Sequence, residues 1–389
     1  MEKKVLIVHN YYQIPGGEDV VVANEKKMLE EHGHEVVLYT RHNSELNSFS
    51  KKQKLLLPVS TIFNLRTYKE LKKIIRDREI DVVHVHNTLN LVSPSVYYAA
   101  FHCKVPVVQT VHNFRLICPG ATFFRDGHVC EECISKGLIC AVKNKCYRDS
   151  RVQTLACVIS TTIHRMLGTY GKLNYICLTE FNTGKLLNLK QMKAERIFIK
   201  PNFVEPAEEI IPYEKRKEQY IYVGRLEEIK GIEILLNAWK SMGQNAPKLL
   251  ICGKGPLEEW CREYIEKNQL TMIEIRGFIP NLEVCKLIGE SKALILPTQV
   301  YEGFPMTIAE SYAHGTPVIG SDLGNTGSLI EDGVSGFKFE PRSARSLSEA
   351  VEKINHSFTG LERNVIEKYS TEKNYQKLRE IYETCCNHH

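Results

Sequence analysis

Short apolar runs alternate with amphipathic segments along the first half of the chain. The run KVLIVH at residues 4–9 predicts a buried strand, and the helical spacing of apolar residues over 19–33 predicts the helix after it. Further strands are predicted at 35–40, 81–86, 105–112, 174–178 and 196–200, and further helices at 68–79 and near 151–170. Strands that alternate with helices indicate βαβ units and hence a parallel sheet.

A second series of the same pattern begins after PNFVEP, a joint at residues 201–206 that is bounded by prolines. Its strands are predicted at 220–224, 248–253, 272–277, 293–297 and 317–321, and its helices at 231–242, 257–268, 281–290, 306–314 and 343–357. Several of these strands run directly into a loop, and open α/β sheets bind ligands beyond the carboxyl ends of their strands. We therefore expect an α/β protein with two Rossmann-like, doubly wound domains that face a central cleft.

Length and composition agree with this expectation. A chain of 389 residues is long for one hydrophobic core, and 25% of charged residues is typical of a globular protein in water. The sequence has no apolar run long enough to cross a bilayer. Its first apolar run is interrupted by His9 and Asn10, which is not typical of a signal peptide. We expect a cytoplasmic protein.

The charge is distributed unevenly along the sequence. Residues 1–200 contain 29 Lys and Arg against 18 Asp and Glu, whereas residues 201–389 contain 22 against 28. A basic half suits an anionic partner such as a phosphate-bearing substrate or a membrane surface, although scattered surface lysines would give the same balance. No nucleic-acid recognition motif accompanies the basic residues, so we expect no nucleic-acid partner.

Glycine-containing loops follow three strands of the second series. In GRLEEIKG, Gly224 ends a strand, and Arg225 and Lys230 offer a planar fork and a compact charge to phosphate oxygens near a helix N-terminus. This spacing alone would equally fit two surface cations near a turn. The loops CGKGP and RGFIP allow a backbone to approach a ligand closely, or serve as tight turns. Their residues of interest are Gly253, Gly255, Phe278 and Ile279.

The stretch YEGFPMTIAESYAHG, residues 301–315, places two carboxylates around a Gly-Phe-Pro turn. Glu302 lies in the loop before the predicted helix, and Glu310 lies inside that helix. Pro305 suits the first turn of a helix, whose free N–H groups would lie close to Gly303. Carboxylates accept hydrogen bonds from vicinal hydroxyls, so the pair predicts contacts with a sugar and a ribose. Two solvated charges on a helix surface are the alternative.

Two features at strand ends of the first series also predict a ligand site. The loop YQIPGGED places Gly16, Gly17 and Glu18 between the first strand and its helix, where an N-terminus can bind an anion or the loop can be a plain turn. The fingerprint G-x-G-x-x-G is absent there, which disfavours a dinucleotide-dependent oxidoreductase. In TVHN, His112 ends a strand and would face the same cleft, with a core histidine as the alternative.

Taken in order, these motifs resemble the retaining GT-B glycosyltransferases of family 4. EGFPMTIAE resembles the E-x7-E motif of that family, and VGRLEEIKG, GKGP, GFI and the HN after a strand stand in the family's order. The resemblance covers nearly the whole chain. It implies an acceptor-side domain over 1–200 with a cysteine-rich insertion at 114–150, and a nucleotide-sugar domain over 201–364. The remaining residues, 365–389, would carry a helix at about 365–386 that crosses back to the first domain.

The resemblance also implies a role for each candidate residue. Arg225 and Lys230 would hold the diphosphate of a nucleoside-diphosphate sugar. Glu302 would hold the donor sugar, Glu310 the ribose hydroxyls, and His112 would contact the sugar near the reacting carbon. Further donor contacts would come from Gly224, Gly253, Gly255, Phe278, Ile279, Gly303, Phe304, Met306 and Thr307, and the acceptor side would include Gly16, Gly17 and Glu18.

The activity that this resemblance implies is transfer of a sugar to a hydroxyl of a glycan or lipid-linked acceptor, as in bacterial surface-polysaccharide synthesis. The expected donor is an NDP-sugar, with a UDP-sugar favoured over a GDP-sugar. We expect no cofactor for catalysis, because Arg225 and Lys230 already oppose the charge that grows on the leaving diphosphate. The alternative is a non-catalytic partner subunit that binds the nucleotide sugar, although such a subunit should have lost some of these residues.

The insertion CPGATFFRDGHVCEECISKGLICAVKNKC has the spacing C-x11-C-x2-C-x12-C. Cys118, Cys130, Cys133 and Cys146 predict a four-thiolate structural zinc site that would order a long loop. Some members of the resembled family carry a similar pattern. Reduced thiols that pack the loop are the alternative.

The segment at residues 51–76 mixes cations with apolar side chains. Such a segment suits contact with an anionic membrane, where a lipid-linked acceptor would lie. A helix that covers the sheet is the alternative.

Overall fold

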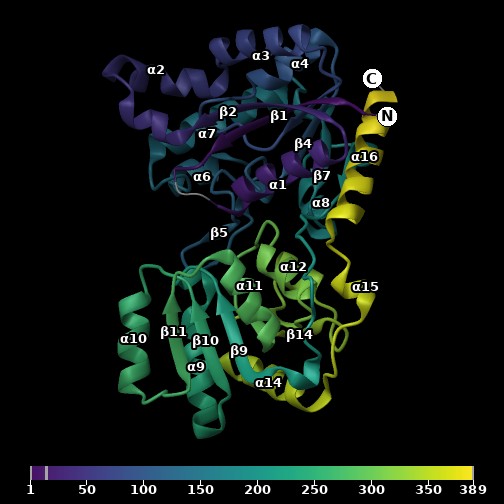
Figure 1. Cartoon of the computed structure of the whole chain (residues 1–389). Coiled ribbons are helices and arrows are strands. Elements are labelled where there is room, and N and C mark those ends of the chain that lie inside the picture. The colour runs from purple at the N-terminus through teal and green to yellow at the C-terminus, as the bar shows by residue number, and fades with distance from the viewer. Residues whose placement is uncertain (1, 14–15, 388–389) are drawn as a thin grey trace. The chain divides into compact units, whose positions relative to one another are not determined.

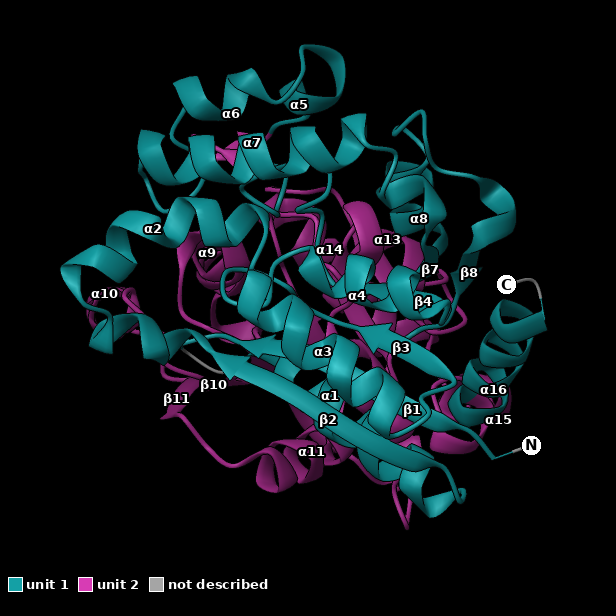
Figure 2. Ribbon diagram, turned by 90° about the horizontal axis from the view of Figure 1, so that it is seen from above, with its two compact units in different colours: residues 1–123, 130–201, 374–389 teal, residues 124–129, 202–373 magenta. Residues whose placement is uncertain are grey.

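The protein is folded into two compact units, coloured separately in Figure 2. The computed structural model describes residues 2–13 and 16–387. The first unit consists of residues 1–123, 130–201 and 374–389, and the second of residues 124–129 and 202–373. Each unit is built on one six-stranded sheet.

The sheet of the first unit is parallel and has the strand order β2-β1-β3-β4-β7-β8, with labels as in Figure 1. Its strands are β1 Lys4–Tyr11, β2 Glu35–His42, β3 Val82–Val85, β4 Val107–Val111, β7 Asn174–Cys177 and β8 Ile197–Ile199. The order reverses between β1 and β3. Open α/β sheets bind ligands beyond the carboxyl ends of the strands at such a reversal, which are Tyr11 and Val85 here.

Helices connect and cover these strands. They are α1 Gly17–Glu31, α2 Lys51–Ile62, α3 Leu65–Asp77, α4 Ser95–Cys103, α7 Arg151–Met166 and α8 Glu180–Leu186. The cysteine-rich insertion adds α5 Glu132–Ser135, α6 Ile139–Lys143 and a hairpin of β5 Phe124–Arg125 and β6 His128–Val129, which groups with the second unit. The last helix, α16 Thr371–Asn387, belongs to the first unit from Asn374 onward and is yellow in Figure 1.

The sheet of the second unit is also parallel, with the order β11-β10-β9-β12-β13-β14. Its strands are β9 Lys217–Val223, β10 Lys248–Cys252, β11 Ile273–Gly277, β12 Ser291–Leu296, β13 Val318–Ser321 and β14 Gly336–Phe339. Its helices are α9 Ile232–Met242, α10 Glu258–Lys267, α11 Asn281–Glu290, α12 Met306–Ala313, α13 Gly324–Leu329, α14 Ala344–Ser357 and α15 Arg363–Ile366. This order reverses between β9 and β12, so the second unit has its own switch point.

The central strands are buried on both faces, which explains their continuous apolar sequences. In β1, Val5, Leu6, Ile7 and Val8 are each 0% exposed. Replacing Leu6 by Ala would therefore cost about 2–5 kcal/mol of stability. In the second unit, the fully buried Trp239 fills the corresponding core and donates its indole N–H to a backbone carbonyl oxygen at 2.8 Å.

A strand or helix occurs at each predicted position, with boundaries that differ by a few residues. Outside the cysteine-rich insertion, α4, α8, α13 and β14 were not predicted. A helix was the alternative interpretation of the basic segment at 51–76, and α2 lies there, with Pro58 inside it although proline normally ends a helix.

The C-terminal helix predicted at about 365–386 is present as α16, Thr371–Asn387, but it begins later than expected. The structure has the short α15, then a break, then α16. Within the break, Tyr369 is buried and Ser370 forms a parallel bridge with Val204, so these residues are tied to the start of the second unit. The chain rejoins the first unit at Asn374 rather than at residue 365.

Candidate functional site

The second unit brings together the loops that follow β9 and β12, the strands on the two sides of its switch point. Lys230 lies in a single 3-10 turn, Glu228–Lys230, that precedes α9 rather than at the start of the helix itself. Its Nζ atom is 2.7 Å from Oε1 of Glu302, which follows β12. The hydroxyl of Thr298 donates to the same oxygen at 2.9 Å. A candidate phosphate ligand and a candidate sugar ligand are therefore direct neighbours.

Three glycines allow these loops to pack backbone against backbone. Gly231 has a φ of +73°, and a Cβ atom there would lie 1.8 Å from the carbonyl oxygen of Pro297. A Cβ atom at Gly253 or Gly255 would lie 1.9 or 2.3 Å from a carbonyl oxygen of the loop after β9. These glycines therefore allow close contact between neighbouring loops. Their contact with a ligand stays a prediction.

Arg225 presents an exposed guanidinium near the start of the loop that follows β9. Its side chain is 65% exposed, and Nη2 is 3.3 Å from Oε2 of Glu227. The backbone carbonyl of Arg225 accepts from the hydroxyl of the buried Tyr222 at 2.8 Å, which fixes the turn after Gly224. An anionic ligand at Arg225 would compete with Glu227 for the guanidinium.

The loop that carries Glu302 is held by hydrogen bonds from Asn325, which was not predicted from the sequence. Asn325 belongs to α13 and is 0% exposed. Its amide donates to the backbone carbonyl oxygens of Glu302 and Gly303, both at 2.6 Å. The neighbouring Phe304 is buried and packs edge-on against Tyr369. The turn before Met306 and Thr307, the first residues of α12, is therefore rigidly supported.

Glu310 lies inside α12, as predicted, and contacts α11. Its Oε1 atom accepts from the amide of Asn281 at 2.9 Å. Burial raises the pKa of Glu310, and this hydrogen bond opposes part of the rise. Asn281 follows the loop with Phe278 and Ile279, and the Phe278 side chain is 75% exposed. The ribose and base ligands implied by the resemblance therefore come from adjacent elements.

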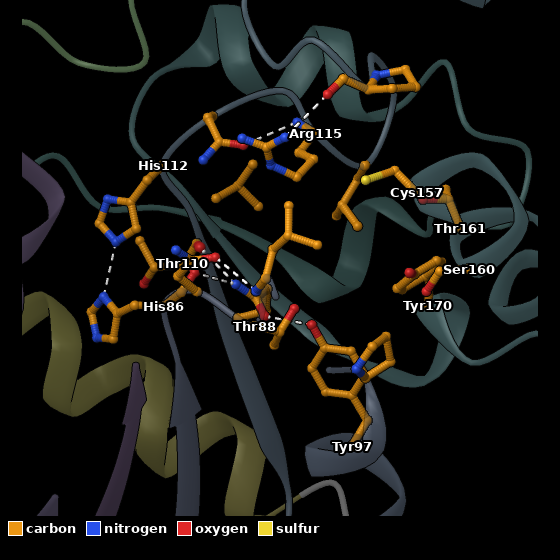
Figure 3. Close-up of a pocket in the computed structure, with 18 of the residues that line it drawn as sticks. His86, Thr88, Tyr97, Thr110, His112, Arg115, Cys157, Ser160, Thr161 and Tyr170 are labelled. Carbon is orange, nitrogen blue, oxygen red and sulfur yellow. Dashed lines mark hydrogen bonds between the residues drawn. The ribbon is translucent and has the colours of Figure 1, made fainter. Parts of the chain in front are cut away.

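In the first unit, His112 follows β4 and contacts His86, which follows β3. Its Nε2 atom is 2.9 Å from Nδ1 of His86, and the two rings are stacked (Figure 3). Burial, followed by the nearby His86, holds the pKa of His112 well below its usual range. His112 is therefore a neutral imidazole that can donate one hydrogen bond and accept another.

Behind His86 lies the fully buried carboxylate of Glu25 from α1. Its Oε2 atom is 3.2 Å from Nε2 of His86, and its Oε1 atom is 2.5 Å from Nζ of Lys200. Burial acts to raise the pKa of Glu25, but Lys200 and the imidazoles of His84 and His86 outweigh it and hold this pKa well below its usual range.

The last helix closes this cluster of buried polar groups. The ammonium of Lys200 also donates to Oδ1 of Asn374 at 2.9 Å, and the Asn374 amide donates to the carbonyl oxygen of Pro201 at 2.6 Å. Further along α16, the hydroxyl of Tyr382 is 2.7 Å from Nδ1 of His84. None of these residues was predicted as part of a site, although the alternating histidines of DVVHVH place two imidazoles on a buried strand and at its end.

The glycine pair after β1 begins α1, and its neighbours form a second polar group. The N–H of Gly16 donates to Oδ2 of Asp19 at 2.9 Å, and Oδ1 of Asp19 is 2.8 Å from Nε2 of His9. The hydroxyl of Tyr12 donates to Glu18 at 3.0 Å. Burial lowers the pKa of His9 to about 4 and raises the pKa of Glu18 to about 8. His9 is therefore neutral at pH 7, and Glu18 holds a proton.

A cavity of about 90 Å³ adjoins the two stacked histidines (Figure 3). Its walls include His86, Thr110, Arg115, Ser160 and Tyr170. Hydroxyl, imidazole and guanidinium groups therefore line one hollow of the first unit, which suits small polar groups such as hydroxyls.

Three cysteines of the insertion come close together. Cys133 and Cys146 pack against the same small apolar cluster, and Cys118 and Cys146 both lie near Gly120. A hydrogen bond from the Cys133 thiol lowers the pKa of Cys118 to about 6, which favours a thiolate there. Thiolates are zinc ligands, so this donor chemistry fits the predicted site. Zinc binding by these residues and Cys130 stays a prediction.

Two family models match the chain. The model of glycosyl transferases group 1 matches residues 205–373, and that of glycosyltransferase family 4 matches residues 15–127. An uncharacterized glycosyltransferase of Methanocaldococcus jannaschii is 23% identical over 316 residues, which are 78% of this chain and 75% of that protein. An uncharacterized 41.2 kDa protein in the cps region of Klebsiella pneumoniae is 20% identical over 94% of this chain and 95% of its own length.

Solved structures resemble the whole chain. The apo form of the lipopolysaccharide outer core galactosyltransferase WaaB has a TM-score of 0.67 at 14% identity, over 98% of this chain and 99% of its own. Anabaena HepE in complex with UDP has a TM-score of 0.64 at 15% identity, over 98% of this chain and 100% of its own. These likenesses confirm the predicted GT-B fold.

Proposed function

This chain belongs to the glycosyl transferases of group 1 and family 4, and from that premise we propose that it transfers a sugar from a nucleoside-diphosphate sugar with retention of anomeric configuration. The observation that carries the proposal is the pairing of Lys230 and Glu302 at 2.7 Å, at the switch point of the second unit. Glu310 lies on the helix that follows this loop. A UDP-sugar is the favoured donor, since HepE was solved with UDP and with UDP-glucose.

The charges at this switch point suit departure of a diphosphate. As the bond from the anomeric carbon to the phosphate oxygen breaks, negative charge grows on the leaving group. Arg225 and Lys230 would oppose this charge. The acceptor oxygen forms a bond to the anomeric carbon on the same face and gives its proton to the leaving phosphate. Loss of one of the two cations should raise the barrier by about 2–4 kcal/mol.

The acceptor that we propose is a hydroxyl of a glycan or of a lipid-linked glycan in surface-polysaccharide synthesis. Support comes from relatives named for such assembly. They include a putative teichuronic acid biosynthesis glycosyltransferase of Bacillus subtilis, 29% identical over 42% of this chain, and an amylovoran biosynthesis glycosyltransferase of Erwinia amylovora, 28% identical over 41%.

We also propose that α2 and α7 rest on the inner face of an anionic membrane. These two helices lie side by side (Figure 2) and expose apolar side chains, among them Leu55 at 79%, Val59 at 63% and Val152 at 70%. The exposed leucines of α2 directly follow Lys51, Lys52 and Lys54 in the sequence KKQKLL. Apolar side chains beside cations suit an anionic lipid surface. Within the described residues, the structure contains no helix that is long and apolar enough to span a bilayer.

The test of the donor site is calorimetric titration of the full chain with UDP, GDP, ADP and dTDP. We expect one nucleotide to bind, and Lys230→Met to weaken it about 10- to 100-fold through loss of a charged hydrogen bond. Arg262→Met is the matched control, because Arg262 is a cation of the same unit that pairs with Glu258 on the surface of α10. Absence of binding to all four nucleotides, or equal effects of both substitutions, would contradict the proposed donor site.

Turnover separates an enzyme from a nucleotide-sugar-binding partner subunit. With the donor identified, we expect sugar release or transfer by the wild type and loss of it in the Lys230→Met variant. The anomeric coupling constant of the product, measured by NMR against that of the donor, tests retention. Binding without any turnover on a panel of glycan and lipid-linked acceptors would favour the partner subunit.

A further inference from the structure

A continuous path of buried polar contacts leads from Lys200 to His112. Lys200 Nζ is 2.5 Å from Glu25 Oε1, Glu25 Oε2 is 3.2 Å from His86 Nε2, and His86 Nδ1 is 2.9 Å from His112 Nε2. Lys200, Glu25 and His86 are 1%, 0% and 4% exposed, so water does not compete for these contacts. Burying an ion pair at this depth is costly, which calls for a reason beyond stability.

The charges at one end of the path decide where the protons lie at the other. Lys200 donates to one oxygen of Glu25, and the second oxygen faces His86 Nε2, which must therefore carry the proton. In the His86 tautomer with its proton on Nε2, the lone pair is on Nδ1. That lone pair can only accept, so His112 donates its Nε2–H to it. His112 is left with its lone pair on Nδ1.

A metal ion is the competing explanation for this cluster. Among the described residues, Glu25, His84 and His86 offer donor atoms that all lie within 4.8 Å of one another. However, the ammonium of Lys200 already balances the carboxylate of Glu25. The two ring nitrogens of His84 are also engaged, one with the Tyr382 hydroxyl and the other with the Thr110 hydroxyl, both at 2.7 Å. The charge of Glu25 is thus balanced by Lys200, and both ring nitrogens of His84 are engaged, without a metal ion.

Resting on the proposed function, we propose that Glu25 and His86 are positioning residues for the transfer reaction, which hold His112 in the tautomer whose Nδ1 accepts a hydrogen bond from a sugar hydroxyl. Neither residue touches the substrate. Glu25 fixes the proton of His86, and His86 in turn fixes the ring plane and the proton of His112. Figure 3 shows the contact between the two rings, which are stacked. The role of Lys200 is to keep Glu25 charged in the interior.

The first test is the kinetics of Glu25→Gln and of the double variant Glu25→Gln with Lys200→Met. The single variant leaves Lys200 buried without its counter-ion, so a lower melting temperature is expected. The double variant removes both charges and should recover the melting temperature, while its kcat stays about 10- to 100-fold below the wild type, because the tautomer of His86 is no longer fixed. UDP affinity should be unchanged in the double variant. A double variant with wild-type kcat would overturn the proposal.

Tyr382→Phe is the matched control. It removes a buried hydrogen bond from His84 in the same cluster but leaves Glu25, His86 and His112 in place. We expect a loss of melting temperature with kcat within about twofold of the wild type. A fall in kcat as large as that of the double variant would show that any damage to this cluster slows the reaction, which would overturn the specific role of Glu25.

A second readout does not depend on turnover. Long-range 1H–15N spectra of the full chain labelled with 15N-histidine report the tautomer of each ring, and the His112 signals are identified by their loss in His112→Asn. We expect the Nε2–H tautomer of His112 in the wild type and a mixture of tautomers in the double variant. If the tautomer is as expected but no donor is turned over, the proposed function fails and the path of buried polar contacts stands. If His112 is an Nδ1–H tautomer or an imidazolium at pH 7, the path itself is refuted.

Discussion

Gly231→Ala tests how closely the two loops at the switch point of the second unit must pack. Gly231 has a φ of +73°, and an added Cβ atom would lie 1.8 Å from the carbonyl oxygen of Pro297. Pro297 begins the loop that carries Glu302, the partner of Lys230. The added methyl group therefore pushes directly on the backbone that positions the candidate sugar ligand.

The size of the effect follows from two separate terms. The left-handed backbone conformation costs an alanine about 1–2 kcal/mol relative to glycine. The contact adds more, because nonbonded carbon and oxygen atoms need about 3 Å or more, so one loop must move by about 1 Å. A displacement of this size near a reacting group can reduce the rate by about 100-fold.

Gly333→Ala isolates the first of these terms. Gly333 lies in a turn of the same unit, between α13 and β14, with a φ of +76°, and an added Cβ atom there would have no atom within 4 Å. Urea unfolding of both variants, together with nucleotide calorimetry, separates the two contributions. We expect Gly333→Ala to lose about 1–2 kcal/mol of stability with unchanged affinity, and Gly231→Ala to lose more and to bind the nucleotide at least tenfold more weakly. Equal losses of stability and equal affinities in the two variants would refute the argument.

Other features give further expectations. Because burial raises the pKa of Glu18 to about 8, the folded protein keeps a proton that the unfolded chain releases, so stability should fall as the pH rises from about 5 to 8, and Glu18→Gln should flatten this fall in thermal melts. The pKa of Glu25 is depressed, so its contribution to stability is present at neutral pH and should disappear on acidification below the usual Glu range; Glu25→Gln with Lys200→Met should lose this acid dependence. Purified protein kept from chelators should contain about one zinc per chain, and Cys133→Ser should remove it; a zinc-free wild type would favour packed thiols. Leu55→Glu should reduce sedimentation with anionic vesicles and leave neutral vesicles unaffected, whereas unchanged sedimentation would argue against the proposed membrane contact.

The layout of the two sheets was predictable because its signal is local. Strands buried on both faces are short, continuous apolar runs such as those in β1 and β9, and each gives its pattern without reference to the rest of the chain. The glycines after β9 and β10 mark loops that approach one another, and these loops were identified as candidates from spacing alone. Glu302 and Lys230 were found for the same reason.

The buried support of the sites was not predictable, because its signal is not local. Glu25 and Lys200 are 175 residues apart in the sequence, and each alone looks like an ordinary surface charge of a helix or a strand end. Asn325 follows a glycine in a segment with the composition of a loop, which hides both its burial and its two hydrogen bonds. Positions of this kind become visible only when elements distant in sequence are brought together.

The return of the chain to the first unit at Asn374 has a consequence for how the protein is made. Synthesis runs from the N-terminus, and most proteins complete their first domain first. Here Lys200 and His84 emerge from the ribosome long before Asn374 and Tyr382, the partners that they contact in the folded protein. The main segment of the second unit, residues 202–373, is fully translated before those partners exist. The first unit is therefore begun first and completed last. Until α16 docks, the ammonium of Lys200 and the imidazole of His84 lack the contacts that Asn374 and Tyr382 later supply.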